Sequence, residues 1–586
     1  MDKNSVIGFG LLMVLLIGYI FYNQQAEAGY LEQKRSDSLA QARLNPPKAT
    51  PLAAATASAS TPDSSNTTPA AVPESLITLE NNDVAIELSN YGAYPKKIRL
   101  KKFKTHSGQP LLLFDGNNNS IDYAFKSKDG RMVHTQNIPF QAQKSADGLS
   151  VNFTSPDFSI TYHIDSNGYM MQTQTQSPNA DISSPMKLLW TSRSLLTEQD
   201  IESQRQYTQV CYNLGKDGYD FFTISEKKDQ DFTQTIKWLS FKQHYFNTTL
   251  ITDNKIMASA KVSAAPVADT ATKALSDFKA DISLVPATSI ALQFFVGPND
   301  YKLLKSYNKE LEEIIPLSYG IFGFVKYINT WIILPIFNFL SGIFSSYGIV
   351  ILLLTLIIRL LISPFTYKSY VSSAKMKALK PELDELKAKY GDDKQAMGVE
   401  QMKMYRQAGV NPLGGCLPAL LQLPVFFALL SFFPHAIELR QSSFLWAHDL
   451  STYDSILNLP FTIPFYGDHV SLFTLLFVIT SILMALYSMN MTMDQDNPMM
   501  KYMPFIMPVM FLGIFNKLPA ALTYYYFVSN VITLLLQFII QKFIINPDKI
   551  HADIQAKKAE GPKESKLMQK MAEMQKQQQE RMKNRK

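Results

Sequence analysis

The sequence lacks the residue patterns that build the common metal, nucleotide and redox sites. It has only two cysteines in 586 residues, and no zinc-ligand spacing, P-loop or dinucleotide-binding glycine motif occurs. Cys211 lies in a polar half of the chain and Cys416 in an apolar run, which argues against a disulfide between them. With no evident pair of nucleophile and base either, we expect no enzyme, no cofactor and no metal.

Apolar residues divide the chain into two unlike halves. Residues 1 to about 300 are mostly polar after one apolar segment at the start, whereas residues from about 320 to 545 are dominated by long apolar runs. This division predicts a soluble domain attached to a membrane domain.

The first segment predicts export of the region that comes after it. An apolar run over Val6–Tyr22 follows Lys3, and the string Ala-Glu-Ala at 26–28 resembles a signal-peptidase site. The segment is therefore either a cleaved signal peptide or an uncleaved signal anchor over residues 1–29 with a cytoplasmic N-terminus. The weakly charged start and the aromatic end of the run favour the anchor. Residues 30–75, rich in Ala, Ser, Thr and Pro, predict a flexible linker.

The exported region over residues 76–305 has the pattern of an all-β domain. Short runs such as Val84, Ile86 and Leu88 alternate with polar residues, and turn signals such as Asp-Gly-Asn at 115–117 separate them. Period two with frequent turns predicts a β-sandwich. No cluster of His, Asp and Ser predicts an active site here, so we expect a folding scaffold or a docking surface.

The apolar runs and the basic segments together predict the membrane topology. The runs cover about 321–344, 347–364, 415–433, 471–489, 502–516 and 520–541. If all crossed, residues 365–414 with their nine Lys/Arg would lie on the side of the exported domain, against the rule that basic loops stay cytoplasmic.

The run at 321–344 contains Pro335 and Gly342, and we predict that the region 306–346 forms an amphipathic helix in the outer interface. The fold class is then a polytopic α-helical membrane protein. A five-span core over 347–545 joins an N-terminal signal anchor and an exported all-β domain, with both termini cytoplasmic.

Two cytoplasmic segments suggest contacts with partners. Residues 365–414 predict a helical hairpin with an apolar stripe that includes Leu379 and Leu383. The tail over 546–586 is basic: the last 45 residues carry 12 Lys/Arg against 6 Asp/Glu. Such a tail is either simply solvated or binds anionic lipid or ribosomal RNA.

Arg359 is the residue with the clearest chemical implication. It lies inside an apolar run with no acid in the same span, and a charge near the middle of a membrane costs roughly 2.5–3.5 kcal/mol on insertion scales. One explanation is that its long side chain reaches the cytoplasmic water. The other is that it serves a function within a hydrated groove.

Polar stripes on two spans favour the groove. Thr355, Arg359 and Ser363 share one helix face, as do Tyr526, Asn530, Thr533 and Gln537, and Gln422 lies between two prolines of a third span. Polar stripes in spans more often hold helices together, but an unpaired Arg in addition favours a wet cavity. Its positive charge would attract the acidic or polar end of an incoming segment. Burial of that segment's own apolar surface would drive insertion without a nucleotide.

Several strings resemble the YidC family of membrane protein insertases. They are LTLIIR at 354–359, AKM at 374–376, YGDDK at 390–394, VNPLGGCLP at 410–418, QLPVF at 422–426, YYFVSN at 525–530, WLSFKQ at 238–243 and FVGP at 295–298. The resemblance covers about residues 76–545. It is weaker in the linker and the long Lys/Gln/Met tail, which depart from the family pattern.

The resemblance implies an inner-membrane insertase and chaperone with a periplasmic β-supersandwich and a groove that holds the Arg. Thr355, Phe426 and Tyr526 would line the path of nascent client proteins. The insertase would act alone or beside the Sec translocon, in contact with membrane lipids. The hairpin and the tail would meet the ribosome or the targeting receptor. The alternative is a secondary transporter with Arg359 as an anion site, although the chain shows no internal repeat of the kind transporters often have.

Overall fold

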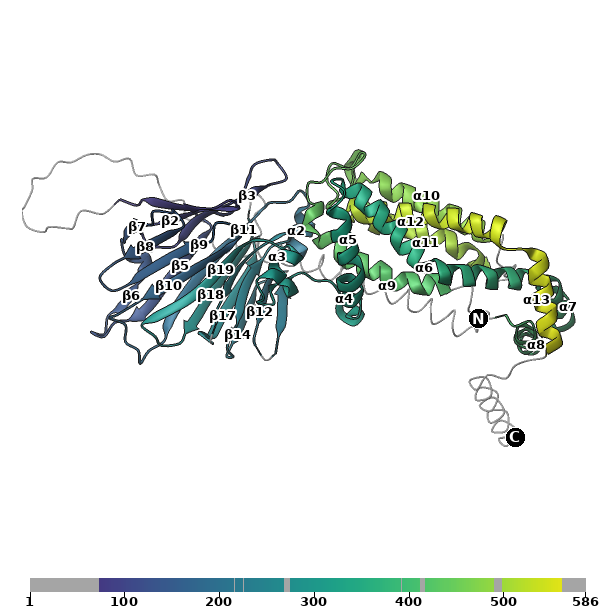
Figure 1. The fold of residues 1–586 in the computed structure, drawn as a ribbon, viewed down its shortest axis with the longest axis horizontal. Coiled ribbons are helices and arrows are strands. Elements are labelled where there is room, and N and C mark those ends of the chain that lie inside the picture. Colours follow the sequence, from purple (N-terminus) through teal and green to yellow (C-terminus); the bar gives the residue numbers. More distant parts are fainter. Residues whose placement is uncertain are drawn as a thin grey trace, which may run out of the picture. The chain divides into compact units, whose positions relative to one another are not determined.

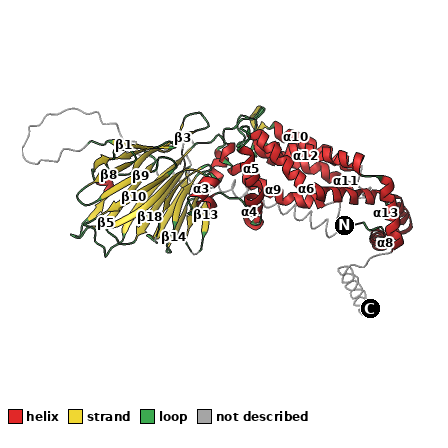
Figure 2. Ribbon diagram, in the orientation of Figure 1, coloured by secondary structure: helices red, strands yellow, loops and turns green. Residues whose placement is uncertain are grey.

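The computed structural model describes residues 73–215, 217–224, 226–253, 255–267, 274–391, 393–410, 417–489 and 498–560. The predicted signal anchor, the predicted linker up to residue 72, Cys416 and the tail beyond residue 560 lie outside these ranges. Strands occupy the first part of the described chain and helices the second (Figures 1 and 2).

The first part is built from antiparallel strands in three sheets. A four-stranded sheet has the order β1-β2-β3-β4, a nine-stranded sheet the order β13-β12-β15-β16-β19-β10-β9-β8-β7, and a six-stranded sheet the order β14-β17-β18-β11-β5-β6. The strands are β1 Leu76–Glu80, β2 Val84–Ser89, β3 Pro95–Lys104, β4 Pro110–Asp115, β5 Asn119–Lys126, β6 Met132–His134, β7 Gln141–Lys144, β8 Ser150–Thr154, β9 Ser159–Ile164, β10 Met170–Gln176, β11 Met186–Leu195, β12 Gln209–Asn213, β13 Tyr219–Thr223, β14 Lys228–Phe232, β15 Trp238–Lys242, β16 Phe246–Ile251, β17 Met257–Pro266, β18 Ala274–Leu284 and β19 Ser289–Pro298.

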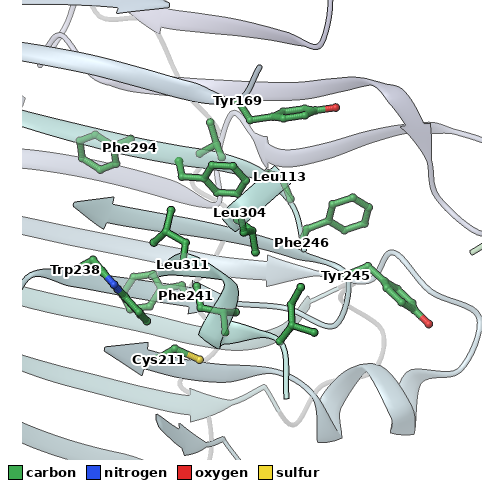
Figure 3. Packing of buried hydrophobic residues seen from close by; sticks show 14 of the residues in the cluster. Leu113, Tyr169, Cys211, Trp238, Phe241, Tyr245, Phe246, Phe294, Leu304 and Leu311 are labelled. Carbon is green, nitrogen blue, oxygen red and sulfur yellow. The ribbon is translucent and has the colours of Figure 1, made fainter. Parts of the chain in front are cut away.

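The two larger sheets pack face to face through aromatic side chains. The rings of Trp190 on β11 and Phe241 on β15 lie 4.3 Å apart, and Phe241 stacks on Phe278 of β18 at 4.6 Å. Figure 3 shows this core, in which Leu304 and Leu311 also take part. The predicted all-β class of this region is therefore confirmed.

Short helices connect the strands and lead out of the β-domain. They are η1 Thr135–Asn137, α2 Ile201–Gln206, α3 Tyr301–Ser306, η2 Leu311–Ile314 and η3 Gly320–Phe322. Asp200 and Asp300 begin α2 and α3, since each carboxylate accepts a hydrogen bond from a backbone N–H of the first turn.

The segment that we predicted as one interfacial helix is divided. It consists of α4 Val325–Ile328, a π-helical turn η4 Asn329–Ile333 and α5 Leu334–Ser341. Pro335 explains the irregularity, because its ring cannot follow a regular α-helical turn and a π-turn relieves the clash. Large side chains such as Trp331 and Phe339 are exposed on its outer face. The location of this segment at a membrane surface stays a prediction.

The second part contains the long helices. They are α6 Tyr347–Ala378, α7 Lys380–Tyr390, α8 Lys394–Gln407, α9 Leu417–Phe432, α10 Leu472–Met489, α11 Pro498–Phe515, α12 Ala520–Ile539 with a π-turn η8 Ile540–Ile544, and α13 Pro547–Glu560. Between α9 and α10 lie η6 Phe433–His435, η7 Ile437–Leu439 and the strand pair β20 Leu457–Ile463 and β21 Gly467–Val470.

Helices α6, α9, α10, α11 and α12 fall on the apolar runs of the sequence. Two stretches within the described residues, Tyr347–Ala378 and Ala520–Ile544, are long and apolar enough to cross a membrane. Three shorter apolar helices cover Leu420–His435, Leu472–Tyr487 and Tyr502–Phe515.

The predicted hairpin differs from expectation in one respect. It begins later than residue 365, because α6 continues through Pro364 as far as Ala378 and the hairpin itself consists of α7 and α8. Helices α7 and α8 then pack against each other, with Leu379 and Leu383 buried between them and Tyr405.

The beginning of the predicted tail is a helix. Ile550 and Ile554 of α13, one turn apart, complete the apolar cluster of the hairpin. Lys558 forms an ion pair with Glu382 on α7 at 2.5 Å, and Asp553 forms another with Lys375 on α6. At least the residues up to 560 are therefore attached to the hairpin.

Candidate functional site

Arg359 lies on the side of α6 that faces α12. Its neighbours Thr355 and Ile358 are buried, whereas Leu360 is half exposed on the outer face of the helix. The ε nitrogen of Arg359 donates a hydrogen bond of 2.6 Å to the Ser529 hydroxyl on α12. The arginine is therefore oriented by the neighbouring helix and does not simply extend away from the bundle.

The surroundings of Arg359 are aromatic and contain no opposite charge within the described chain. Tyr370, Tyr525 and Tyr526 lie close enough to interact with its charge, and no carboxylate of the described chain pairs with it. A guanidinium carries five N–H donors, and the bond to Ser529 is the one that it makes to a described residue. Its other donors can therefore receive a carboxylate or a backbone carbonyl from outside the chain.

The hydroxyls predicted to share the α6 stripe are satisfied within that helix. Thr355 is buried and donates to the Ile351 carbonyl at 2.6 Å, and Ser363 donates to the Leu360 carbonyl at 2.8 Å. Of the three stripe residues, Arg359 is therefore the one whose side chain bonds to another helix.

Phe426 and Tyr526 lie together next to the arginine. Their rings are 5.4 Å apart, and the Tyr526 hydroxyl donates to the Phe426 carbonyl at 3.3 Å. Phe477 and Phe515 extend this aromatic cluster from α10 and α11. Helices α9 to α12 therefore meet at one aromatic surface beside Arg359.

The rest of the predicted site residues have other environments. Asn530 donates to Ser481 and Thr480 on α10, so it links α12 to α10 by interhelical hydrogen bonds. Thr533 bonds to the Ser529 carbonyl within α12, and Gln537 is buried. Gln422 differs from these residues: it is half-buried on α9, and its side chain lies near that of Tyr525 beside Arg359.

Ser529 and Tyr525 were not predicted as site residues. Ser529 is three residues after Tyr526 and four before Thr533, so its helical spacing already placed it on the same stripe. The Tyr525 hydroxyl is buried and lies near the side chains of Ser529 and Gln422. Both side chains belong to the immediate surroundings of Arg359.

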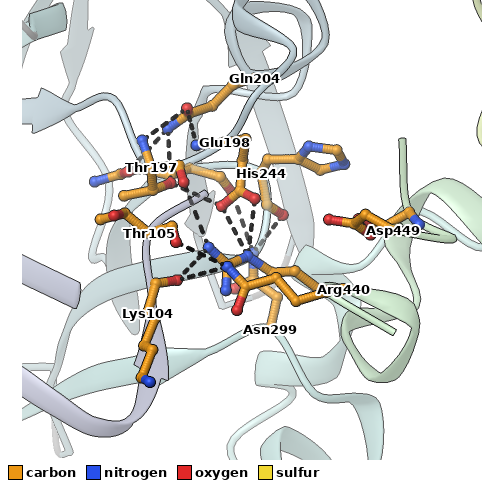
Figure 4. A network of polar contacts seen from close by, with 12 residues as sticks. Lys104, Thr105, Thr197, Glu198, Gln204, His244, Asn299, Arg440 and Asp449 are labelled. Atoms are coloured by element: carbon orange, nitrogen blue, oxygen red, sulfur yellow. Dashed lines mark hydrogen bonds and ion pairs between the residues drawn. The ribbon is translucent and has the colours of Figure 1, made fainter. Parts of the chain in front are cut away.

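A second buried arginine joins the α9–α10 loop to the β-domain (Figure 4). Arg440 makes two hydrogen bonds to Glu198, at 3.0 and 2.8 Å, and donates to the Lys104 carbonyl at 2.7 Å. Its guanidinium also lies over the ring of Phe246. Burial raises the pKa of the Glu198 carboxyl, an effect that the charge of Arg440 opposes.

His244 strengthens the same junction. Its ring donates to the Pro434 carbonyl at 2.7 Å and stacks on Tyr245. Burial holds the pKa of His244 well below its usual range, so the ring is neutral at physiological pH. This junction was not predicted from the sequence.

Two protein families match the chain, and together they cover most of it. The family described as "YidC periplasmic domain" matches residues 76–338, and the family described as "60Kd inner membrane protein" matches residues 339–548. The boundary between the two matches falls within α5.

Relatives with the name "Membrane protein insertase YidC" match along nearly the whole chain. The protein of Parabacteroides distasonis is 34% identical over 99% of this chain and 98% of its own length. That of Amoebophilus asiaticus is 36% identical over 94% of each chain. Among solved structures, an active YidC insertase with its first transmembrane domain resolved covers 81% of this chain and 94% of its own, at 18% identity and a TM-score of 0.34.

Proposed function

Because the chain belongs to the YidC family of membrane protein insertases, we propose that Arg359 receives the polar or acidic part of client segments during their insertion into the inner membrane. The family is one of multi-pass inner-membrane proteins with a periplasmic domain, which here is the β-domain. Two features go beyond family membership: a groove around Arg359 and a path along the aromatic cluster of Phe426 and Tyr526.

The proposal rests on the unpaired charge of Arg359 and on its N–H donors that have no partner among the described residues. Its ε nitrogen is held by Ser529, while no carboxylate of the described chain neutralises its charge. In a medium of low dielectric constant, a charge with free donors attracts an anionic or carbonyl group more strongly than it would in water. A client segment with a polar end supplies such groups, and Arg359 lowers the cost of bringing them into the membrane.

The apolar part of the client provides the driving force. Burial of apolar surface releases roughly 25 cal/mol per Å², so a segment of about 20 apolar residues gains far more than the few kcal/mol needed to move a polar end. Phe426 and Phe477, the partly exposed members of the aromatic cluster, would give that segment an apolar contact. No nucleotide enters this scheme.

Partners at the cytoplasmic side are suggested by the hairpin and the tail. The ends of α6, α7 and α8 are rich in basic residues, and α13 adds Lys557 and Lys558 in its last turn. We propose that this basic end contacts the ribosome or the targeting receptor, and that the core cooperates with the Sec translocon for some clients. The five-span core, the signal anchor and the cytoplasmic location of both termini belong to the same proposal.

The transporter alternative has less support. Arg359 would serve as an anion site in either case, but the relatives that match along the whole chain are named as insertases. No feature of the described helices favours transport.

The test is replacement of the protein in cells depleted of it, followed by an assay of insertion of small inner-membrane proteins. We expect Arg359→Ala to lower insertion at least about tenfold, equivalent to about 1.4 kcal/mol, because the positive charge is lost. Arg359→Lys should largely retain insertion. Ser363→Ala is the matched control on the same helix, since its hydroxyl serves only the Leu360 carbonyl among the described residues.

Each other outcome contradicts a stated part of the proposal. Normal insertion of every client after depletion would refute the insertase function of this chain. Equal loss in Arg359→Ala and Arg359→Lys would show that guanidinium geometry matters and charge alone does not. Full activity of Arg359→Ala would remove Arg359 from the mechanism and leave the family assignment intact.

A further inference from the structure

The loop between α9 and α10 carries a strand pair with an unusual surface. In β20 and the residue before it, four large apolar side chains are exposed: Ile456 by 49%, Leu457 by 56%, Phe461 by 61% and Ile463 by 37%. No charged residue occurs from 455 to 467. In water such an apolar edge strand is a liability, because it promotes aggregation.

The strand pair is fixed to the ends of two apolar helices. The Asn516 side chain, just after α11, donates to the carbonyls of Tyr466 and His469 and accepts from the backbone of Ser471 at the start of α10. Gly513 in the last turn of α11 lies so close that an added Cβ would be 2.5 Å from the Phe465 carbonyl oxygen. The backbone of the hairpin therefore packs directly on the helix ends.

The pairing of the two strands presents Phe461 outward. Asn458 pairs with His469 and Ile463 pairs with Gly467, so four residues of β20 lie opposite a single residue of β21. These four residues, with Pro460 and Phe461 at their centre, bulge from the ladder. A two-stranded sheet on its own is marginally stable, so these exposed apolar groups call for a supporting surface.

The exposed apolar surface continues from the helices into the hairpin. Ile506, Val509 and Ile514 are exposed along α11. The β20–β21 strand pair lies at the C-terminal end of that helix. Charged groups occur only beyond it: Asp468 and Lys517 are both exposed and interact with each other. A change from apolar to charged groups across a few residues is typical of the edge of a bilayer.

We infer that β20 and β21 form an interfacial anchor, with Phe461 and its apolar neighbours inserted among the lipids of the outer leaflet. The partner is the phospholipid bilayer itself. The apolar face of β20 carries no charge and continues the exposed apolar surface of α11, and this arrangement fits acyl chains better than a soluble protein. The anchor fixes the height of the ends of α10 and α11 in the membrane. It does not depend on the role proposed for Arg359.

The test uses nitroxide labels on the full-length protein in phospholipid nanodiscs. Cys211 and Cys416 are first replaced by Ala, and single cysteines are then introduced by Phe461→Cys or, in the second variant, Leu457→Cys. Leu352→Cys on the exposed face of α6 provides the lipid reference, and Met132→Cys, 60% exposed in the β-domain, provides the water reference. The collision rates of each label with oxygen and with a water-soluble nickel chelate are measured.

We expect oxygen to reach the label at Phe461 more readily than the nickel chelate does, as at Leu352 and in contrast to Met132. Equal access of both reagents, as at Met132, would place the hairpin in water and overturn the inference. Shielding from both reagents would show that protein covers the strand, from a second copy or from the chain itself, and would also overturn it. Agreement between the labels at Phe461 and Leu457 guards against local distortion by one substitution.

Discussion

Arg359 and Arg440 are both withdrawn from bulk water, but their surroundings are opposite. Arg440 is paired with the carboxylate of Glu198 through two hydrogen bonds and also donates to the carbonyl of Lys104. Arg359 has a single hydrogen bond to the described part of the chain, which goes to the hydroxyl of Ser529. The chain itself neutralises the charge of Arg440 with the Glu198 carboxylate, whereas no described carboxylate neutralises the charge of Arg359.

This difference separates a structural role from a functional one. A buried pair such as Arg440 and Glu198 adds little to stability compared with apolar residues, but the loss of one partner is severe because it strands a charge. Among the described residues, no carboxylate would be left buried without a partner if Arg359 were removed. Its removal therefore spares the fold and affects what the arginine can bind.

The largest difference between the two arginines is expected when Arg440 is replaced. We expect Arg440→Ala to destabilise the β-domain by about 3–5 kcal/mol, because Glu198 is left buried without its partner. Urea unfolding of the full-length protein, followed by the fluorescence of Trp190 and Trp238 in a background without the other two tryptophans, measures the loss.

The double variant Glu198→Leu/Arg440→Met should recover much of that loss, since no charge remains. Arg359→Ala serves as the comparison and should leave the same unfolding curve nearly unchanged. If Arg359→Ala destabilised the β-domain as much as Arg440→Ala, the distinction between the two arginines would fail.

Lys242 extends the comparison to a cation that can lose its proton. It is fully buried, its ammonium donates to the carbonyl of Tyr207 and to Gln209, and burial lowers its pKa from 10.5 to about 8. Between pH 8 and 10.5 the unfolded chain therefore binds a proton that the folded chain does not, so this group makes stability rise with pH across that window. Below pH 8 the cost of burying the charge is present in full.

We expect the wild type to gain about 2 kcal/mol relative to Lys242→Met between about pH 7 and 9.5, from the ~1.36 kcal/mol that each pKa unit represents. The same fluorescence measurement at the two pH values gives this difference. Parallel pH profiles of the two proteins would mean that Lys242 is ionised equally in the folded and unfolded states.

The smallest expected effect concerns Ser529. Ser529→Ala removes the acceptor that orients Arg359, and a hydrogen bond to a charged group contributes about 1.5–3 kcal/mol at most. Because other donors of the guanidinium remain, we expect insertion to fall only a few-fold, with recovery in Ser529→Thr. Insertion assays at matched protein levels measure this effect.

A positioning role can be told apart from a structural one with the lysine variant. Lysine lacks the planar guanidinium and therefore the ε N–H group that bonds to Ser529. Ser529→Ala should then have no further effect on insertion in an Arg359→Lys background. Asn530→Ala is the matched control one residue away: it removes a bond between α12 and α10 and should lower stability without changing insertion per folded molecule. Equal losses of insertion per folded molecule in Ser529→Ala and Asn530→Ala would show that Ser529 does not position Arg359.

Local patterns predicted most of the architecture. Alternation such as Val84, Ile86 and Leu88 sufficed because these three side chains lie on one face of β2 and are buried in the core. The apolar runs predicted the long helices because helices α6 and α12 are each continuous and apolar over enough residues. These are properties of neighbouring residues, so the sequence displays them directly.

Contacts between distant residues could not be predicted in this way. Arg440 and Glu198 are 242 positions apart, and Arg359 and Ser529 are 170 apart. Nothing in the neighbourhood of Arg440 indicates a buried partner. The residue spacing along α12 is compatible with Ser529 on the polar stripe. Only the packing of α6 against α12 shows that Ser529 faces Arg359, whereas the neighbouring Asn530 faces α10.

Helix α13 has a consequence for the order in which the molecule is completed during translation. The apolar cluster of the hairpin includes Ile550 and Ile554, and both ion pairs that tie α13 down use residues after 550. All five predicted spans must therefore be synthesised before the apolar cluster of the hairpin is complete, although α7 and α8 can pair earlier. Until then, the part of this cluster that α13 covers stays exposed.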